Sequence, residues 1–248
     1  MTERPTVLVP RQVLEGESIP EGIPELLSGV HVLLLGYHVL PEQTATEQGR
    51  EQFGEKATKR LAEFETMLEA KGATVETRLV FTHEAQQTIN RVIVEEDCFA
   101  VLIPKATPPV ERVLVAVRGT VGLDRLVAVL GGLFADSETD LSLYHVREGQ
   151  ETSEQTEAMF DEFESALVAA GITSEQLDTT VGTGTQLIEL LAEAAEDHEL
   201  VVMGETDPSI ATYVFGLPQD QLAAQFLGPV LVVQRPPPEP YPETSLDE

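Results

Sequence analysis

Leu200-Val201-Val202-Met203-Gly204 and Gly228-Pro229-Val230-Leu231-Val232-Val233 are the two stretches that decide how this chain folds. Each is a short apolar run without polar alternation, which is typical of a strand buried on both faces of a parallel sheet. The residues between them predict a loop followed by a helix. In an open α/β sheet, ligands bind where such loops leave the carboxyl ends of strands, so the loop after Gly204 is the first candidate site.

The same alternation of strands and helices extends back to the N-terminus. The pattern predicts strands at 6–9, 30–40, 74–81 and 99–103, a short helix at 23–27, and longer helices at 44–71 and 84–96. The helix at 44–71 has apolar residues at every third or fourth position and ends before Gly72. Alternating strands and helices predict an α/β fold of doubly wound parallel sheets, with helices on both faces.

The second half of the chain repeats the first. Val7-Leu8-Val9 corresponds to Val113-Leu114-Val115, Tyr37-His38-Val39 to Tyr144-His145-Val146, Glu63-Phe64-Glu65 to Glu162-Phe163-Glu164, and Gly72 to Gly171. The first copy stops after Ile103, and Pro108-Pro109 marks a linker. We therefore predict two tandem domains, a truncated one at 1–107 and a complete one at 108–235, followed by a disordered Pro-rich acidic tail at 236–248.

Four motifs of the second copy resemble the universal stress protein family. They are Leu114-Val115-Ala116-Val117 with Gly119, the aromatic-His-Val at 144–146, Val201-Val202-Met203-Gly204, and Gly228 to Val233. The resemblance covers the second copy completely and the first copy up to its missing last unit. It implies a tandem member with the adenine nucleotide alpha hydrolase-like fold.

Nucleotide-binding members of that family have a loop of Gly-x-x-Gly, nine residues, and Gly-Ser or Gly-Thr, whose backbone N–H groups surround phosphates. Here Gly204 matches the first glycine, Asp207 replaces the second, and Leu217 replaces the third, with Gly216 one position early. A carboxylate at 207 would repel a triphosphate. The resemblance therefore implies a degenerate nucleotide site with no assigned cofactor; the alternative is ATP or another adenine nucleotide.

The acidic residue with which this family contacts the nucleotide is replaced by Arg118 in the second copy and by Gln12 in the first. Arg118 either pairs with Glu205 or Asp207 in the loop, or binds an anionic ligand. The candidate binding residues are Val117, Arg118, Val146, Met203, Gly204 and Gly216.

No nucleophile has a recognisable base near it, so we predict that the chain is not an enzyme. An enzyme of ATP hydrolysis or nucleotidyl chemistry is the least supported alternative. His38 and His145 are at equivalent strand ends, but one histidine per site makes a poor metal centre. We expect no metal, and we expect both histidines to be hydrogen-bonded structural residues.

Charge excludes several partners. The chain has 15 Lys and Arg against 43 Asp and Glu, a net charge of −28 that disfavours nucleic acid and anionic membrane surfaces. Such acidity suits a salt-rich cytoplasm, and Val7-Leu8-Val9-Pro10 with Val13-Leu14-Glu15-Gly16 resembles halophilic archaeal members of the family. A single cysteine and the lack of a run of about 18 apolar residues predict a cytoplasmic protein without membrane insertion.

The strand at 230–233 is expected to be an apolar edge, which requires a partner. We favour a homodimer formed through this strand; the alternative is that the first copy's sheet covers it. The sequence as a whole predicts a universal-stress-protein-like stress-response or regulatory protein, with an unidentified protein partner possible. The alternative function is a sensor that binds an adenine nucleotide or another anionic metabolite in the C-terminal crevice.

Overall fold

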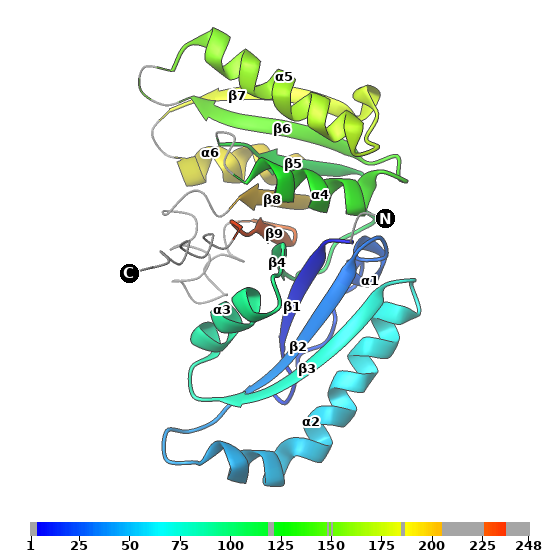
Figure 1. The fold of residues 1–248 in the computed structure, drawn as a ribbon, viewed down its shortest axis with the longest axis vertical. Coiled ribbons are helices and arrows are strands. Elements are labelled where there is room, and N and C mark those ends of the chain that lie inside the picture. Colours follow the sequence, from blue (N-terminus) through cyan, green and yellow to red (C-terminus); the bar gives the residue numbers. More distant parts are fainter. Residues whose placement is uncertain are drawn as a thin grey trace, which may run out of the picture.

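The computed structural model describes residues 4–118, 122–147, 149, 151–184, 187–204 and 226–236. Their strands form one nine-stranded sheet of order β3-β2-β1-β4-β9-β8-β5-β6-β7, with helices on both faces (Figure 1). We call residues 4–103 the N-half and residues 112–236 the C-half. None of the described helices is long and apolar enough to cross a bilayer.

The N-half follows the predicted pattern closely. Its elements are β1 (Thr6–Gln12), α1 (Ile23–Leu26), β2 (His31–Val39), α2 (Thr46–Glu69), β3 (Thr74–Thr82), α3 (Ala85–Glu95) and β4 (Ala100–Ile103). The prediction that β1 ends at Pro10 is wrong. The N–H of Val13 donates to the carbonyl oxygen of Tyr37 in β2. Because backbone N–H groups alternate in direction along a strand, an N–H at position 10 would point toward β4. The pairing of β1 with β4 already stops at Leu8. The missing N–H of Pro10 therefore interrupts no ladder.

The C-half contains the second copy of the pattern. Its elements are β5 (Arg112–Ala116), α4 (Leu123–Phe134), β6 (Asp140–Arg147), α5 (Ser153–Ala169), β7 (Leu177–Thr183), α6 (Leu187–Ala194), β8 (Leu200–Gly204) and β9 (Val230–Val233), with single 3₁₀ turns at Ser174–Gln176 and Ala195–Asp197. The helix predicted between Gly204 and Gly228 falls mostly outside the described residues, and so does nearly all of the predicted tail.

The prediction of two separate sheets is wrong, because β9 joins them. It pairs in parallel with β8, from Val201↔Val230 to Gly204↔Val233, and antiparallel with β4, from Ala100↔Val233 to Ile103↔Val230. The N-half ends at β4 with an open edge because residues 104–111 lead directly into β5. Two apolar strand edges, one in each half, thus satisfy each other's backbone hydrogen bonds.

The expectation that residues 230–233 form an exposed edge is wrong for the same reason. Both sides of β9 are paired within the chain, so in this structure the strand has no free edge to pair with a second chain. The alternative, cover by the first copy's sheet, is what the structure contains. The homodimer itself stays a prediction.

One hydrophobic core continues across both halves. Helices α1, α2, α4 and α5 pack on one face of the sheet and share a single cluster of buried residues, whereas α3 and α6 cover the other face with separate clusters. Phe64 of α2 and Phe163 of α5 are at equivalent places in the repeat, and both are fully buried. In each Glu-Phe-Glu motif, the phenylalanine is a core residue, the preceding glutamate is exposed and the following one is half-buried.

Two further contacts hold the halves together on the α4 side. A Cβ added to Gly29, in the turn between α1 and β2, would lie 2.1 Å from the carbonyl oxygen of Gly132 in α4. The guanidinium of Arg125 in α4 pairs with Asp97, donates to the carbonyl oxygen of Cys98 at 3.1 Å, and lies 4.5 Å above the ring of Phe99. The halves are therefore joined by backbone contact and by a buried cation as well as by the sheet.

Candidate functional site

The strand ends that could bind ligands lie at two opposite edges of the sheet. Because β4 is antiparallel to β9, the strands of the N-half run opposite to those of the C-half. The N-half edge is made by the ends of β1, β2 and β3 at Gln12, Val39 and Thr82. The C-half edge is made by the ends of β5, β6, β8 and β9 at Ala116–Arg118, Val146–Arg147, Met203–Gly204 and Val233–Arg235.

The structure brings five of the six predicted binding residues to the C-half edge. Ala116 of β5 is in register with both Tyr144 of β6 and Met203 of β8, and the N–H of Val117 donates to the carbonyl oxygen of Tyr144 at 2.9 Å. Val117, Val146 and Met203 are buried, Gly204 is half-buried and Arg118 is exposed. The sixth residue, Gly216, lies outside the described residues, as do Glu205, Asp207 and Leu217.

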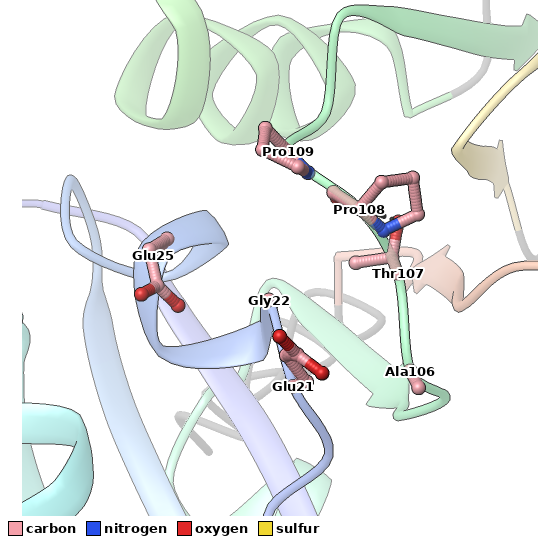
Figure 2. A pocket seen from close by; sticks show the side chains of 7 residues that line it. All are labelled: Glu21, Gly22, Glu25, Ala106, Thr107, Pro108 and Pro109. Atoms are coloured by element: carbon pink, nitrogen blue, oxygen red, sulfur yellow. Dashed lines mark hydrogen bonds between the residues drawn. The ribbon is translucent and has the colours of Figure 1, made fainter.

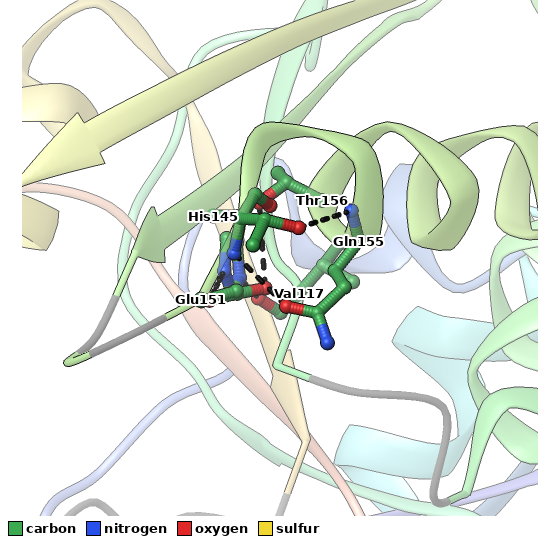
Figure 3. A network of polar contacts seen from close by, with 6 residues as sticks. Val117, His145, Glu151, Gln155 and Thr156 are labelled. Carbon is green, nitrogen blue, oxygen red and sulfur yellow. Dashed lines mark hydrogen bonds and ion pairs between the residues drawn. The ribbon is translucent and has the colours of Figure 1, made fainter.

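His145 ties the end of β5 to the start of α5 (Figure 3). Its Nδ1 lies 2.9 Å from the carbonyl oxygen of Val117, and its Nε2 lies 2.8 Å from the carboxylate of Glu151. Both ring nitrogens face oxygen acceptors, so both hydrogen bonds form when the ring carries a proton on each nitrogen. Glu151 immediately precedes Thr152, which forms a capping box with Gln155 at the N-terminus of α5.

The expectation of a hydrogen-bonded structural histidine is confirmed for His145 and is wrong at Nδ1 of His38. That buried nitrogen has no hydrogen-bond partner. The ring instead packs edge-on against Phe53 and Phe81, with centroids 5.2 and 6.1 Å apart. Two residues equivalent in sequence therefore differ in role, since only one of them joins two elements through polar contacts.

We expect His145→Phe to lower the free energy of unfolding by about 2 kcal/mol, because the Val117 carbonyl and the Glu151 carboxylate both lose a donor. His38→Phe is the matched control. We expect it to change the free energy by less than about 1 kcal/mol, because the ring already contacts aromatic side chains and Nδ1 has no bond to lose. Urea unfolding of both variants measures the difference, and equal effects would contradict the assigned role of His145.

Three arginines lie at or just after strand ends at the C-half edge. Residues 108–235 contain five basic residues, Arg112, Arg118, Arg125, Arg147 and Arg235. Three of them end or follow strands at this edge: Arg118 after β5, Arg147 at the end of β6 and Arg235 after β9. The Nε of Arg147 is buried without a hydrogen-bond partner among the described residues. Sequence reasoning identified Arg118 alone, although each of the three comes within two residues of the end of an apolar run.

The N-half edge is occupied by the chain's own carboxylate. Glu17 accepts a hydrogen bond from the backbone N–H of Gln12 at 2.9 Å and pairs with Arg11 at 3.1 Å. Arg60 of α2 donates to the carbonyl oxygen of Glu17 at 2.8 Å. Burial lowers the pKa of the Arg11 guanidinium, and the adjacent Glu17 carboxylate opposes that shift. A protein carboxylate thus binds the N–H at the end of β1, a position where a bound anion would otherwise find a donor. Sequence reasoning missed Glu17.

The described residues supply few groups for catalysis. They contain no group of three or more His, Cys, Asp or Glu side chains that could hold a metal ion. Cys98 is fully buried, and its pKa is raised to about 12 by desolvation and, to a smaller extent, by Glu96 and Asp97. The side chain is therefore a thiol at neutral pH and a poor nucleophile.

A groove of about 450 Å³ lies between the start of α1 and the linker (Figure 2). Its residues are Glu21, Gly22, Glu25, Ala106, Thr107, Pro108 and Pro109. Glu25 is paired with Lys71 at 2.8 Å, and the N–H of Thr107 donates to the carbonyl oxygen of Glu21 at 3.0 Å. The groove combines carboxylates with proline rings, and the bond between Thr107 and Glu21 joins the linker to the start of α1.

Comparison with known proteins identifies the fold. No family model matches the chain, and no curated protein matches it. Among solved structures, a universal stress protein from Archaeoglobus fulgidus matches with a TM-score of 0.65 at 17% identity, covering 94% of this chain and 97% of that one.

Two other structures match with TM-scores below 0.5. A putative universal stress protein from Pseudomonas aeruginosa has a TM-score of 0.48 at 16% identity, over 94% of each chain. A universal stress protein crystallised with cAMP has a TM-score of 0.41 at 23% identity, covering 50% of this chain and 97% of that one. The match to the Archaeoglobus structure extends over both halves of the chain. The chain therefore has the fold of a universal stress protein.

Proposed function

We propose that this chain is a non-enzymatic stress-response or regulatory protein of the universal stress protein type, with degenerate nucleotide sites. The observation that carries the proposal is the contact of Glu17 with Gln12 and Arg11 at the N-half edge. A carboxylate from the protein itself satisfies the strand-end donor and the adjacent cation there. An incoming phosphate would have to displace Glu17 and leave it beside like charge.

The sequence of the loop after Gly204 supports the same conclusion for the C-half edge. Asp207 and Leu217 stand where the family's loop has glycines, so one phosphate-binding backbone turn loses conformational freedom and gains a negative charge. Such a protein would act through contacts with partners and not through turnover of a nucleotide. The tandem organisation favours one chain performing the role that two copies of a single unit would share.

Native mass spectrometry of the purified full chain tests the proposal. We expect the mass of the polypeptide alone, without a copurified nucleotide. A stoichiometric adduct with the mass of ATP, ADP, AMP or a cyclic nucleotide would contradict it. Ammonium acetate at high concentration keeps the acidic chain folded during the measurement, because it screens the repulsion among its carboxylates.

A second candidate function is a sensor for an anionic metabolite at the C-half edge. It is favoured by the placement of Arg118, Arg147 and Arg235 on β5, β6 and β9, since guanidinium groups bind carboxylates and phosphates in a bidentate way. The two candidates differ in one measurement. A copurified small anion whose affinity falls by about tenfold or more in Arg147→Gln would favour the sensor.

The acidic composition leads us to propose adaptation to a salt-rich cytoplasm. With a net charge of −28, self-repulsion destabilises the folded chain at low salt, and about 1 M salt shortens the Debye length to about 3 Å. We expect the midpoint of thermal unfolding to rise between about 0.1 and 2 M KCl. A midpoint that falls over this range, measured by circular dichroism, would contradict the adaptation.

A further inference from the structure

Three arginines from different elements line one groove at the free edge of the sheet. They are Arg50 of α2, Arg78 of β3 and Arg91 of α3, and the groove has a volume of about 320 Å³. We call it the arginine groove; its other residues are Thr46, Glu47, Leu79, Val80 and Phe81. Strand β3 is the last strand on this side of the sheet and pairs only with β2, so backbone groups of residues 78–81 lie along the groove without a neighbouring strand.

This concentration of positive charge contrasts with the rest of the chain. Only 15 of 248 residues are Lys or Arg, against 43 acidic residues, yet three of those 15 line a single groove. Mutual repulsion among guanidinium groups disfavours such a cluster unless anions balance it. Glu95 and Glu96 of the protein balance part of this charge through Arg78 and Arg91.

The three arginines differ in how far the protein itself satisfies them. Arg78 donates to Glu95 and Glu96 of the α3 end at 2.6 Å each, and the hydrogen bond to Glu95 is the main cause of its raised pKa. Arg91 lies 3.6 Å from Glu95, beyond normal hydrogen-bond length, and the described residues give Arg50 no ion pair. Arg78 is therefore held in place, whereas Arg50 and Arg91 have donors left for a ligand.

We propose that the arginine groove binds a small metabolite through a polyvalent oxyanion of the phosphate class. Planar guanidinium groups match such oxyanions with paired N–H donors, and free backbone N–H groups of the edge strand add further donors. A volume of about 320 Å³ admits a phosphate together with a small organic group. A long polyanion such as nucleic acid is disfavoured, because its remaining charge would face a protein of net charge −28.

Glu47 allows a test of whether the groove binds an anion. It is the one acidic side chain among the lining residues, so its carboxylate weakens the binding of an anion. Lys59 offers a matched control, because it is an exposed cation on the same helix α2 but does not line the groove. Changing Lys59 to glutamine alters the net charge of the chain by the same amount as changing Arg50 to glutamine.

Isothermal titration of the full chain with pyrophosphate, at one fixed KCl concentration, tests the proposal. We expect saturable binding to the wild type, weakened by about tenfold or more in Arg50→Gln and in Arg91→Gln. Glu47→Gln should bind more tightly, and Lys59→Gln should bind within about twofold of the wild type. No saturable binding to the wild type would overturn the proposal.

Equal weakening by Lys59→Gln and Arg50→Gln would also overturn it, because the attraction would then come from overall charge. All four substituted residues are exposed, so circular dichroism should show unchanged folding. The arginine groove is distinct from both strand-end edges. Binding of pyrophosphate that is insensitive to Arg50 and Arg91 but is lost in Arg147→Gln would place the anion at the C-half edge and overturn the assignment to this groove.

Discussion

Gly29→Ala is expected to lower the free energy of unfolding by about 3 kcal/mol. A Cβ at position 29 would lie 2.1 Å from the carbonyl oxygen of Gly132. Both atoms belong to segments held by backbone structure, the turn before β2 and helix α4. No side chain can rotate to relieve the overlap, so the N-half and C-half must separate locally.

Gly54→Ala is the matched control for this prediction. In helix α2, the nearest heavy atom to a Cβ at position 54 is the Cγ of Arg50, at 3.7 Å, which is an ordinary contact. Alanine in a helix interior is favoured over glycine by about 1 kcal/mol, so this variant should be slightly more stable than the wild type. Urea unfolding compares the two, and a Gly29→Ala protein as stable as the wild type would show that the halves do not meet at this contact.

Arg125→Met is expected to lower the free energy of unfolding by about 2 to 3 kcal/mol. Arg125 is 8% exposed, and the substitution leaves the buried Cys98 carbonyl without its donor and Asp97 without its partner. The contact with the Phe99 ring is lost as well. The Asp97 side chain is 60% exposed, so water solvates its carboxylate when the arginine is removed. The loss of stability is therefore smaller than for a fully buried ion pair.

Arg112→Met provides the same chemical change at an exposed position of β5. We expect it to alter the free energy by less than about 0.5 kcal/mol, since that side chain has no ion pair among the residues that the structure describes. Arg125→Lys should recover only part of the lost stability, because an ammonium cannot donate to Cys98 and Asp97 in the geometry of the guanidinium fork. A fully stable Arg125→Met variant would contradict the role of this residue in joining the halves.

The sequence predicted the elements well because each one carries its own periodic pattern. Buried strands such as β2 and β8 are continuous apolar runs, and α2 has an apolar residue at every third or fourth position. The internal repeat likewise indicated that the order of elements in the first copy recurs in the second. These features depend on neighbours along the chain, which a sequence displays directly.

The partner of β9 could not be predicted in the same way. The run Val230–Val233 shows that the strand is buried but carries no information on which edge it meets. The pairing with β4 depends on two segments more than 120 residues apart, and on the early end of the first copy. For that reason, two sheets and an exposed edge were expected where the chain forms one sheet.

The position of the candidate site could be predicted, because it is set by where the strands end. Val117, Val146 and Met203 meet because parallel strands end at one edge of a sheet. The Glu17 contact with Arg11 and the Glu151 contact with His145 were not predicted. Each depends on how a loop returns over a strand end, and no periodic pattern in the sequence records such a path.

The two halves therefore retain one backbone design with different polar chemistry at the strand ends. At the N-half edge, Arg11 is paired with Glu17. At the C-half edge, three arginines lie at strand ends, and His145 is paired with Glu151. We propose that nucleotide binding is lost at both edges.

Isothermal titration of the full chain with ATP, at about 2 M KCl and with magnesium present, measures whether either edge binds a nucleotide. We predict no saturable heat up to about 1 mM ATP, which corresponds to a Kd weaker than about 1 mM. Saturable binding of one ATP per chain with a Kd in the micromolar range, unchanged in Arg50→Gln and Arg91→Gln, would contradict the proposal and would show that a strand-end edge of this protein still accepts a nucleotide.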